Sequence, residues 1–172
     1  GVNIDNAAAW LDAGAAAVIV TSWVFHDGTL DRDRLTALSK AVGPERLVLD
    51  LSCRAREGAY YIVTDRWQRY TREMISPELL ADLSAYCGEY LVHAVDVEGK
   101  CSGIEAELVS LLAQWGEKPI TYAGGIHNQA DLDRIDAIGR GRIDFTVGSA
   151  LDIFGGKGFA YADLAARYGG GH

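Results

Sequence analysis

Carboxylates and a histidine follow two apolar segments of this sequence. Asp50 ends one apolar run, and His93 and Asp96 end another, with Glu98 just beyond. A carboxyl group with a tuned pKa can act as a general acid or base, and an imidazole can donate a hydrogen bond to a substrate oxygen. Asp50 could instead be bonded to loop amides, His93 could be satisfied by backbone, and Asp96 and Glu98 could simply be solvated. The residue types alone leave both interpretations open.

Two further apolar segments, near the C-terminus, run directly into glycine. They are Pro119-Ile-Thr-Tyr-Ala-Gly-Gly125 and Ile143-Asp-Phe-Thr-Val-Gly-Ser149. A strand that ends on glycine lets backbone N–H groups approach an anion, and a following helix adds its positive N-terminal dipole. The alternative is that these glycines only allow helix and strand to pack closely. The phosphate interpretation predicts a binding cup made by Gly124, Gly125, Gly148 and Ser149.

Two hydroxyls and one aromatic ring complete the candidate residues. Thr21 and Ser22 end the earliest apolar run, although such residues are common at strand ends. Trp67 lies in a polar surround, where its ring could stack over a flat heterocycle as a lid or simply anchor the loop.

These residues must be brought together by the elements that carry them. Apolar runs cover 16–21, 46–52, 90–96, 119–125 and 143–149, and helical patterns cover 6–14, 30–42, 77–86, 104–115, 129–138 and 161–168. Their alternation predicts an α/β fold with a parallel sheet of βα units. The uninterrupted run at 16–21 is typical of a strand buried on both faces. A run at 58–63 after the second strand predicts a hairpin with its turn at 56–58.

The number of strands predicts a (β/α)8 TIM barrel that is incomplete. A full barrel has eight strands and about 250 residues, with its active site at the carboxyl ends of the strands. The 172 residues supply about the last five βα units. Residues 1–172 are therefore predicted to form a single partial barrel domain that lacks the first strands.

Composition excludes several classes of protein. The net charge is −8 and the 16 Lys and Arg do not cluster, so nucleic-acid binding is not expected. No run approaches the roughly 18 apolar residues of a membrane span. The three cysteines, Cys53, Cys87 and Cys101, lack metal-site or disulfide spacing and are predicted to be reduced thiols, which indicates a cytoplasm-like compartment.

Several of these motifs resemble one known family. The matching segments are Ile19–Phe25, Leu49–Arg54, His93–Gly103, Thr121–Ile126 and Val147–Gly156. They are similar to the eukaryotic-type branch of phosphoribosylformimino-5-aminoimidazole carboxamide ribotide isomerase, an enzyme family of histidine biosynthesis. The resemblance covers essentially the whole chain.

The resemblance implies a (β/α)8 barrel that needs no cofactor and no metal. Its reaction is an Amadori rearrangement of an aminoaldose (ProFAR) to an aminoketose (PRFAR), and its substrate is a phosphorylated ribosyl-aminoimidazole with two phosphates. Asp50 matches the general acid, and His93 takes the place of a threonine that hydrogen-bonds the substrate. Glu98 takes the place of a substrate-contacting aspartate. Gly124, Gly125, Gly148 and Ser149 match one phosphate site, and Thr21 and Ser22 match part of the other.

The resemblance also leaves alternatives. The other essential carboxylate of the family lies on a first strand that this sequence lacks, so the chain is expected to be a fragment, inactive alone and prone to self-association through exposed sheet edges. The other interpretations are the sister cyclase of the same pathway and a non-catalytic phosphosugar-binding partial barrel completed by a partner chain. A cytoplasmic location is expected, or a plastid if the source is a plant.

Overall fold

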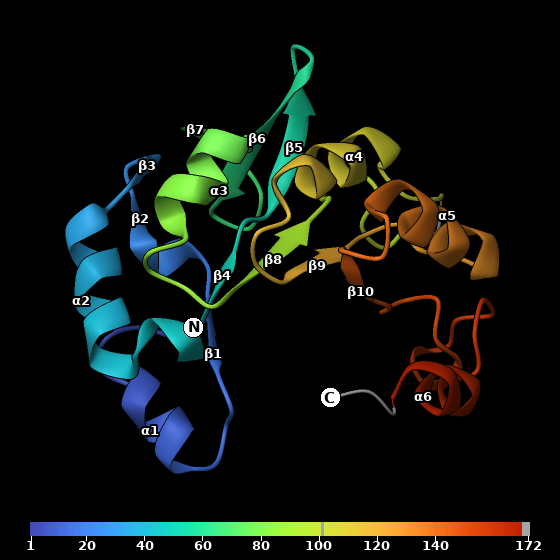
Figure 1. The fold of residues 1–172 in the computed structure, drawn as a ribbon, viewed down its shortest axis with the longest axis horizontal. Helices are drawn as coiled ribbons and strands as arrows, with labels where there is room; N and C mark the ends of the chain where they lie inside the picture. The colour runs from blue at the N-terminus through green and yellow to red at the C-terminus, as the bar shows by residue number, and fades with distance from the viewer. Residues whose placement is uncertain (101, 170–172) are drawn as a thin grey trace.

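The chain forms one curved parallel sheet with helices on its outer side. The computed structural model describes residues 1–100 and 102–169. The sheet has five strands in the order β1-β4-β8-β9-β10, and each neighbouring pair is parallel. The strands are β1 (Val18–Val20), β4 (Leu47–Asp50), β8 (Glu89–His93), β9 (Ile120–Ala123) and β10 (Asp144–Thr146). Their spatial order follows the order along the chain, as in the wall of a βα barrel (Figure 1).

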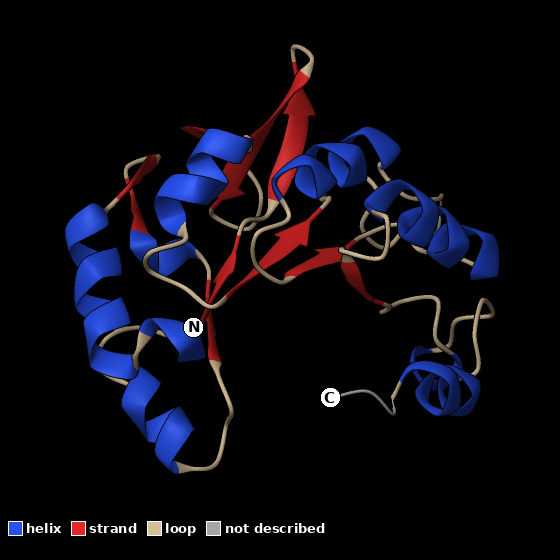
Figure 2. Cartoon of the chain, in the orientation of Figure 1, coloured by secondary structure: helices blue, strands red, loops and turns tan. Residues whose placement is uncertain are grey.

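The helices occur where the sequence predicts them, with ends that differ by three residues or fewer. They are α1 (Ala7–Asp12), α2 (Arg32–Val42), α3 (Pro77–Leu83), α4 (Ala106–Trp115), α5 (Gln129–Gly139) and α6 (Tyr161–Tyr168). Short 3-10 turns are η1 (Ser22–Val24), η2 (Pro44–Arg46) and η3 (Asp152–Phe154). Helices and strands alternate along the curve in Figure 2, which confirms the predicted α/β class.

Two small antiparallel units lie outside the parallel sheet. The first contains β5 (Cys53–Arg56), β6 (Ala59–Thr64) and β7 (Arg69–Met74), and the second contains β2 (Phe25–His26) and β3 (Thr29–Leu30). The predicted hairpin is confirmed as β5–β6, with Glu57 and Gly58 at positive φ in its turn. Strand β7 and the β2–β3 hairpin were not predicted. In β7 only Thr71 is buried, so its sequence carries no apolar pattern.

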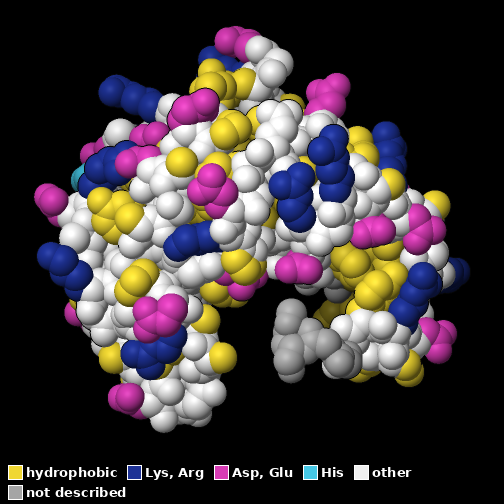
Figure 3. All heavy atoms as spheres, in the orientation of Figure 1, with side chains coloured by type: hydrophobic (Ala, Val, Ile, Leu, Met, Phe, Trp, Pro, Cys, Tyr) yellow, Lys and Arg dark blue, Asp and Glu magenta, His cyan; other side chains and the backbone are white. Residues whose placement is uncertain are grey.

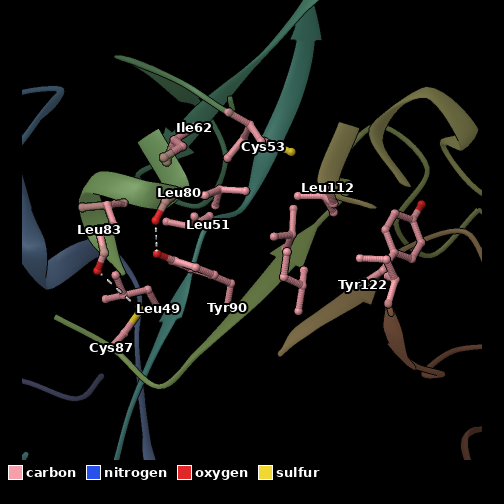
Figure 4. Close-up of a cluster of buried hydrophobic side chains, with 14 of the residues drawn as sticks. Leu49, Leu51, Cys53, Ile62, Leu80, Leu83, Cys87, Tyr90, Leu112 and Tyr122 are labelled. Atoms are coloured by element: carbon pink, nitrogen blue, oxygen red, sulfur yellow. Dashed lines mark hydrogen bonds between the residues drawn. The ribbon is translucent and has the colours of Figure 1, made fainter. Parts of the chain in front are cut away.

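The core lies between the sheet and the helices. Figure 4 shows Tyr90 of β8 reaching α3, where its hydroxyl donates a hydrogen bond of 2.6 Å to the carbonyl of Leu80. The thiols of Cys53 and Cys87 are buried and free, as predicted, and burial raises the pKa of the Cys87 thiol. Cys101 lies outside the described residues.

The prediction that the first strand is buried on both faces is wrong. Val18 and Val20 are buried, but Ile19 between them is 49% exposed. Strand β1 is at the edge of the sheet, and no strand among the described residues pairs with its free side. An uninterrupted apolar run therefore predicts the strand but not what covers its second face.

The surface agrees with the composition. Acidic and basic side chains are interspersed on the face shown in Figure 3, and no continuous basic area is seen there. Within the described ranges no helix is both long and apolar enough to cross a membrane, and the longest have 11 residues.

Candidate active site

Two adjoining cavities open at the carboxyl ends of the parallel strands. The first has a volume of about 220 Å³, and its lining includes Thr21, Ser22, Asp50, Trp67 and His93. The second has a volume of about 240 Å³, and its lining includes His93, Glu98, Gly124, Gly125, Gly148 and Ser149. Apart from Asp96, each candidate site residue from the sequence thus lines one of the two cavities. His93 lines both.

Asp50 is the carboxylate at the end of β4. Its side chain is 12% exposed and accepts a hydrogen bond of 3.0 Å from the hydroxyl of Ser52. Burial raises the pKa of Asp50, while the charge of His93 and the Ser52 hydroxyl act in the opposite direction. A carboxyl group that keeps its proton to a higher pH than usual is suited to general-acid chemistry.

His93 lies at the end of β8 between two carboxylates. Its Nδ1 is 3.9 Å from Oδ1 of Asp50, and its Nε2 is 3.7 Å from Oε2 of Glu98. Nδ1 is buried and has no hydrogen-bond partner among the described residues. The interpretation of His93 as a core histidine satisfied by backbone is therefore wrong. The imidazole is placed to exchange a hydrogen bond or a proton with a group in either cavity.

The two acidic residues after β8 have different surroundings. Both oxygens of Asp96 accept hydrogen bonds, one of 2.8 Å from Nε of Arg54 and one of 2.9 Å from the amide of Ala55. Asp96 is therefore not simply solvated, but holds two loops together. Glu98 faces the second cavity and His93.

The glycines at the strand ends differ in what lies around them. A Cβ on Gly124 would lie 2.7 Å from the carbonyl oxygen of Ala94, and one on Gly125 would lie 2.1 Å from that of Gly103. Both glycines also have positive φ. Close packing thus accounts for this pair, although the neighbours belong to the segment after β8 and not to a helix as the structural alternative predicts. Gly148 has no heavy atom within 4 Å of the corresponding position, so packing does not explain it.

The helix after the first glycine pair does not present a free N-terminus. The Asn128 side chain accepts from the amide of Asp131, while the Asp131 carboxylate accepts from the amides of His127 and Asn128. These bonds satisfy N–H groups that an anion would otherwise use. The amides of His127, Asn128 and Asp131 are therefore not available to a phosphate, and a cup at this end of β9 relies on other backbone amides.

Trp67 lies in the loop that joins β6 to β7. Asp65, Arg66 and Trp67 all have left-handed backbones, with φ of 51°, 53° and 68°. Left-handed φ is costly for side chains other than glycine, and such residues cluster at functional sites. The Trp67 ring is 41% exposed, and its centroid is 6.2 Å from that of His93. This exposure favours the lid interpretation over a buried anchor.

Comparison with known families identifies the group to which this architecture belongs. A family model described as "Histidine biosynthesis protein" matches residues 1–157. The chain belongs to the histidine biosynthesis protein family. The resemblance found in the sequence motifs is thereby confirmed, and the five-stranded parallel sheet is part of a TIM-barrel fold.

Three relatives of this histidine biosynthesis protein are named 1-(5-phosphoribosyl)-5-((5-phosphoribosylamino)methylideneamino)imidazole-4-carboxamide isomerase. A chloroplastic one from Medicago truncatula is 51% identical over 166 residues, which are 96% of this chain and 53% of the relative. One from Yarrowia lipolytica is 44% identical over 171 residues, covering 95% and 65% of the two chains. One from Saccharomyces cerevisiae is 40% identical, covering 95% and 64%. The chain thus spans between half and two thirds of the length of these relatives.

Several residues that line the first cavity in this family member were not predicted as site residues from the sequence. Ser52, Thr64 and Arg66 line the first cavity, and Arg66 supplies a positive charge there. A hydroxyl two residues after Asp50 on the same run was a usable signal for Ser52. Thr64 and Arg66 depend on the β6–β7 loop, whose second strand carries no apolar pattern.

The hairpin β2–β3 lies beside the β6–β7 unit that carries the Trp67 loop. The amide of Arg72 in β7 donates a hydrogen bond of 3.0 Å to the carbonyl of Gly28, and Arg69 lies 3.6 Å from Asp27. Loops that follow two different strands are therefore bonded to each other. In the part of the chain that the structure describes, no group of His, Cys, Asp or Glu is arranged to hold a metal ion.

Proposed function

We propose that this chain carries much of the active site of an aldose–ketose isomerase of histidine biosynthesis. The reaction is the Amadori rearrangement of ProFAR, an aminoaldose with two phosphoribosyl groups, to the aminoketose PRFAR. The observation that supports it best is the buried Asp50 carboxyl beside His93, at the junction of two cavities lined by polar groups. The printed names of the relatives support the same reaction.

In this proposal Asp50 is the general acid. Its proton goes to the ring oxygen of the aminoaldose furanose, and the C1–O bond breaks to give an open-chain iminium. Loss of the C2 proton then forms an enolamine. Protonation at C1 and loss of the proton of the C2 hydroxyl give the aminoketose, so the substrate gains two protons and loses two and its composition is unchanged. Burial raises the pKa of Asp50, which keeps the donor protonated at higher pH. The base that takes the C2 proton is left unassigned.

The two cavities suit a substrate with an anion at each end. Thr21 and Ser22 offer hydroxyls to one phosphate, and the loop amides of Gly124, Gly125, Gly148 and Ser149 form the site for the other. His93 and Glu98 would bind sugar hydroxyls between them, and Trp67 would stack on the imidazole. The proposal includes no cofactor and no metal.

The test is to incubate the full-length protein with ProFAR and follow the products by ¹H NMR and mass spectrometry. The expected result is loss of one anomeric signal with no change in mass and no added cofactor. No conversion of ProFAR, but cleavage of separately added PRFAR into two products in the presence of ammonia, would favour the sister cyclase. Binding without any chemical change would favour a phosphosugar-binding protein and contradict the isomerase.

Replacing Trp67 tests the proposed lid. Trp67→Ala is expected to raise KM for ProFAR several-fold while kcat changes less, because stacking area is lost but the acid remains in place. Steady-state kinetics measure both constants. Trp10→Ala, which removes an exposed ring on α1, is the matched control. Unchanged kinetics in Trp67→Ala would remove the lid.

Ser52 tests the electrostatics of Asp50. Its hydroxyl stabilises the ionised carboxylate and so lowers the pKa of Asp50. Ser52→Ala therefore raises that pKa further, and the alkaline limb of kcat/KM, where the acid loses its proton, is expected to move to higher pH. The pH profile of kcat/KM is the measurement, with Ser84→Ala at the C-cap of α3 as control. A shift to lower pH would contradict the role of Asp50 as an acid.

Two further predictions from the sequence stay predictions. One is self-association through the edges of the sheet at β1 and β10. The other is the compartment, for which a cytoplasmic location is expected. The Medicago relative is named as a chloroplastic protein, which supports a plastid location if this protein comes from a plant.

A further inference from the structure

The segment after β8 is a tight turn that carries His93 at one end and Glu98 near the other. Its backbone bonds run from Val97 to Ala94, from Glu98 to Val95 and from Lys100 to Val97, at 3.2 to 3.3 Å. These bonds connect the residues of the turn to one another, while His93 itself is paired with Ala123 in the sheet. The anchors of the turn therefore help to set the distance between the imidazole of His93 and the carboxylate of Glu98.

The amide of Val95 donates a hydrogen bond of 3.0 Å to the carbonyl of Cys53, and Asp96 adds side-chain bonds between this turn and β5, the strand that follows Asp50. Oδ1 of Asp96 accepts from Nε of Arg54 at 2.8 Å, and its Oδ2 accepts from the amide of Ala55 at 2.9 Å. One carboxylate thus bonds two consecutive residues, which fixes its orientation as well as its distance. Both charged side chains are partly exposed, so the pair contributes little to global stability. Its effect is on geometry.

The opposite side of the turn lies against the glycine pair of the second cavity. A Cβ on Gly125 would lie 2.9 Å from Val97, and the amide of Gly103 donates a hydrogen bond of 3.0 Å to the Gly125 carbonyl. The turn is therefore held between β5 on one side and the β9 loop on the other. Asp96 is the side chain that connects it to the strand following Asp50.

We propose that Asp96 is a positioning residue: by bridging Arg54 and Ala55 it holds the turn so that His93 lies between Asp50 and Glu98. This proposal rests on the proposed isomerase function for its kinetic consequence, but its geometric consequence is independent of the substrate. Arg54, on this account, acts through Asp96.

The geometric test uses the ring signals of His93 in the full-length protein. Asp96→Asn and Arg54→Met are each expected to shift the His93 ring resonances in ¹H–¹³C spectra, assigned by their loss in His93→Gln. Arg56→Ala is the matched control, because Arg56 on the same strand lies beside Glu57 and over the ring of Tyr70. Unshifted His93 signals in both Asp96→Asn and Arg54→Met would overturn the proposal whether or not the protein is an isomerase.

The kinetic test asks whether Asp96 acts through Glu98. Asp96→Asn is expected to lower kcat for ProFAR on the order of 10- to 100-fold with a smaller change in KM, since misplacement by about 1 Å can cost that much. In a Glu98→Gln background the same substitution is expected to have much less effect. The positioning role would be overturned if Asp96→Asn lowered kcat by the full, additive factor in the Glu98→Gln background. It would also be overturned if kcat were unchanged in both Asp96→Asn and Arg54→Met. A wild-type protein that does not convert ProFAR would instead contradict the proposed function.

Discussion

Asp50→Asn is expected to lower kcat for ProFAR by about 10²- to 10⁴-fold with KM little changed, because that range is the usual contribution of a general acid or base. Asparagine keeps the size of the side chain and an oxygen for the Ser52 hydroxyl, but it has no acidic proton to give. Steady-state kinetics with Asp163→Asn, an acidic residue of α6, as control would measure the effect. A near-normal rate in Asp50→Asn would remove Asp50 from the mechanism.

Although Asp50→Asn is expected to lose activity, it is not expected to lose stability in unfolding experiments. Burial raises the pKa of Asp50 in the folded protein, so the native state binds this proton more tightly than the unfolded chain. The stability that follows is present below the ordinary carboxyl pKa and is lost as pH rises through the raised value. Asp50→Asn is therefore expected not to lower the melting temperature at neutral pH. A loss of activity without a loss of stability would separate chemistry from folding.

Gly125→Ala is expected to lower thermal stability, whereas Gly148→Ala is expected to weaken substrate binding. At Gly125 the left-handed backbone costs alanine about 1–2 kcal/mol, and the collision with the Gly103 carbonyl adds about 1–3 kcal/mol of overpacking. For a chain of this size, the melting temperature should fall on the order of 10 °C. Thermal unfolding followed by circular dichroism is the measurement.

Gly148→Ala should keep its stability, since its added methyl meets no heavy atom within 4 Å and its φ lies outside the left-handed region. If the Gly148 amide approaches a phosphate, the methyl interferes with a hydrogen bond to a charged group, which is worth about 1.5–3 kcal/mol. KM should then rise about tenfold or more. An unchanged KM would place the phosphate elsewhere, and an unchanged melting temperature in Gly125→Ala would contradict the packing account of the glycine pair.

The sequence was sufficient to predict the parallel sheet and the residues at its strand ends. Apolar runs give strands, and in a barrel of βα units the carboxyl ends of those strands share one face. Asp50, His93 and Gly148 could therefore be assigned to the same site before any coordinates were known. The branching of that site into two cavities that meet at His93 depends on side-chain positions, which no periodicity encodes.

What could not be predicted depends on polar contacts between distant segments. Strand β7 is held by its ladder with β6 and by Gly28, and its single buried residue, Thr71, leaves no pattern. The capping of α5 by Asp131 is indicated in the sequence by an asparagine followed three residues later by an acid, a signal that competes with an anion for the same helix end. The link from Asp96 to Arg54 joins residues 42 positions apart.

The sharing of His93 between the two cavities has a thermodynamic consequence. A small phosphorylated molecule that fills one cavity and fixes the imidazole also changes the free energy of binding in the other, because both ligands act on the same ring. Such linkage is reciprocal: each half-ligand alters the affinity of the other by the same factor. If two fragments of a substrate are added together, the change that each causes in the affinity of the other measures the coupling through His93.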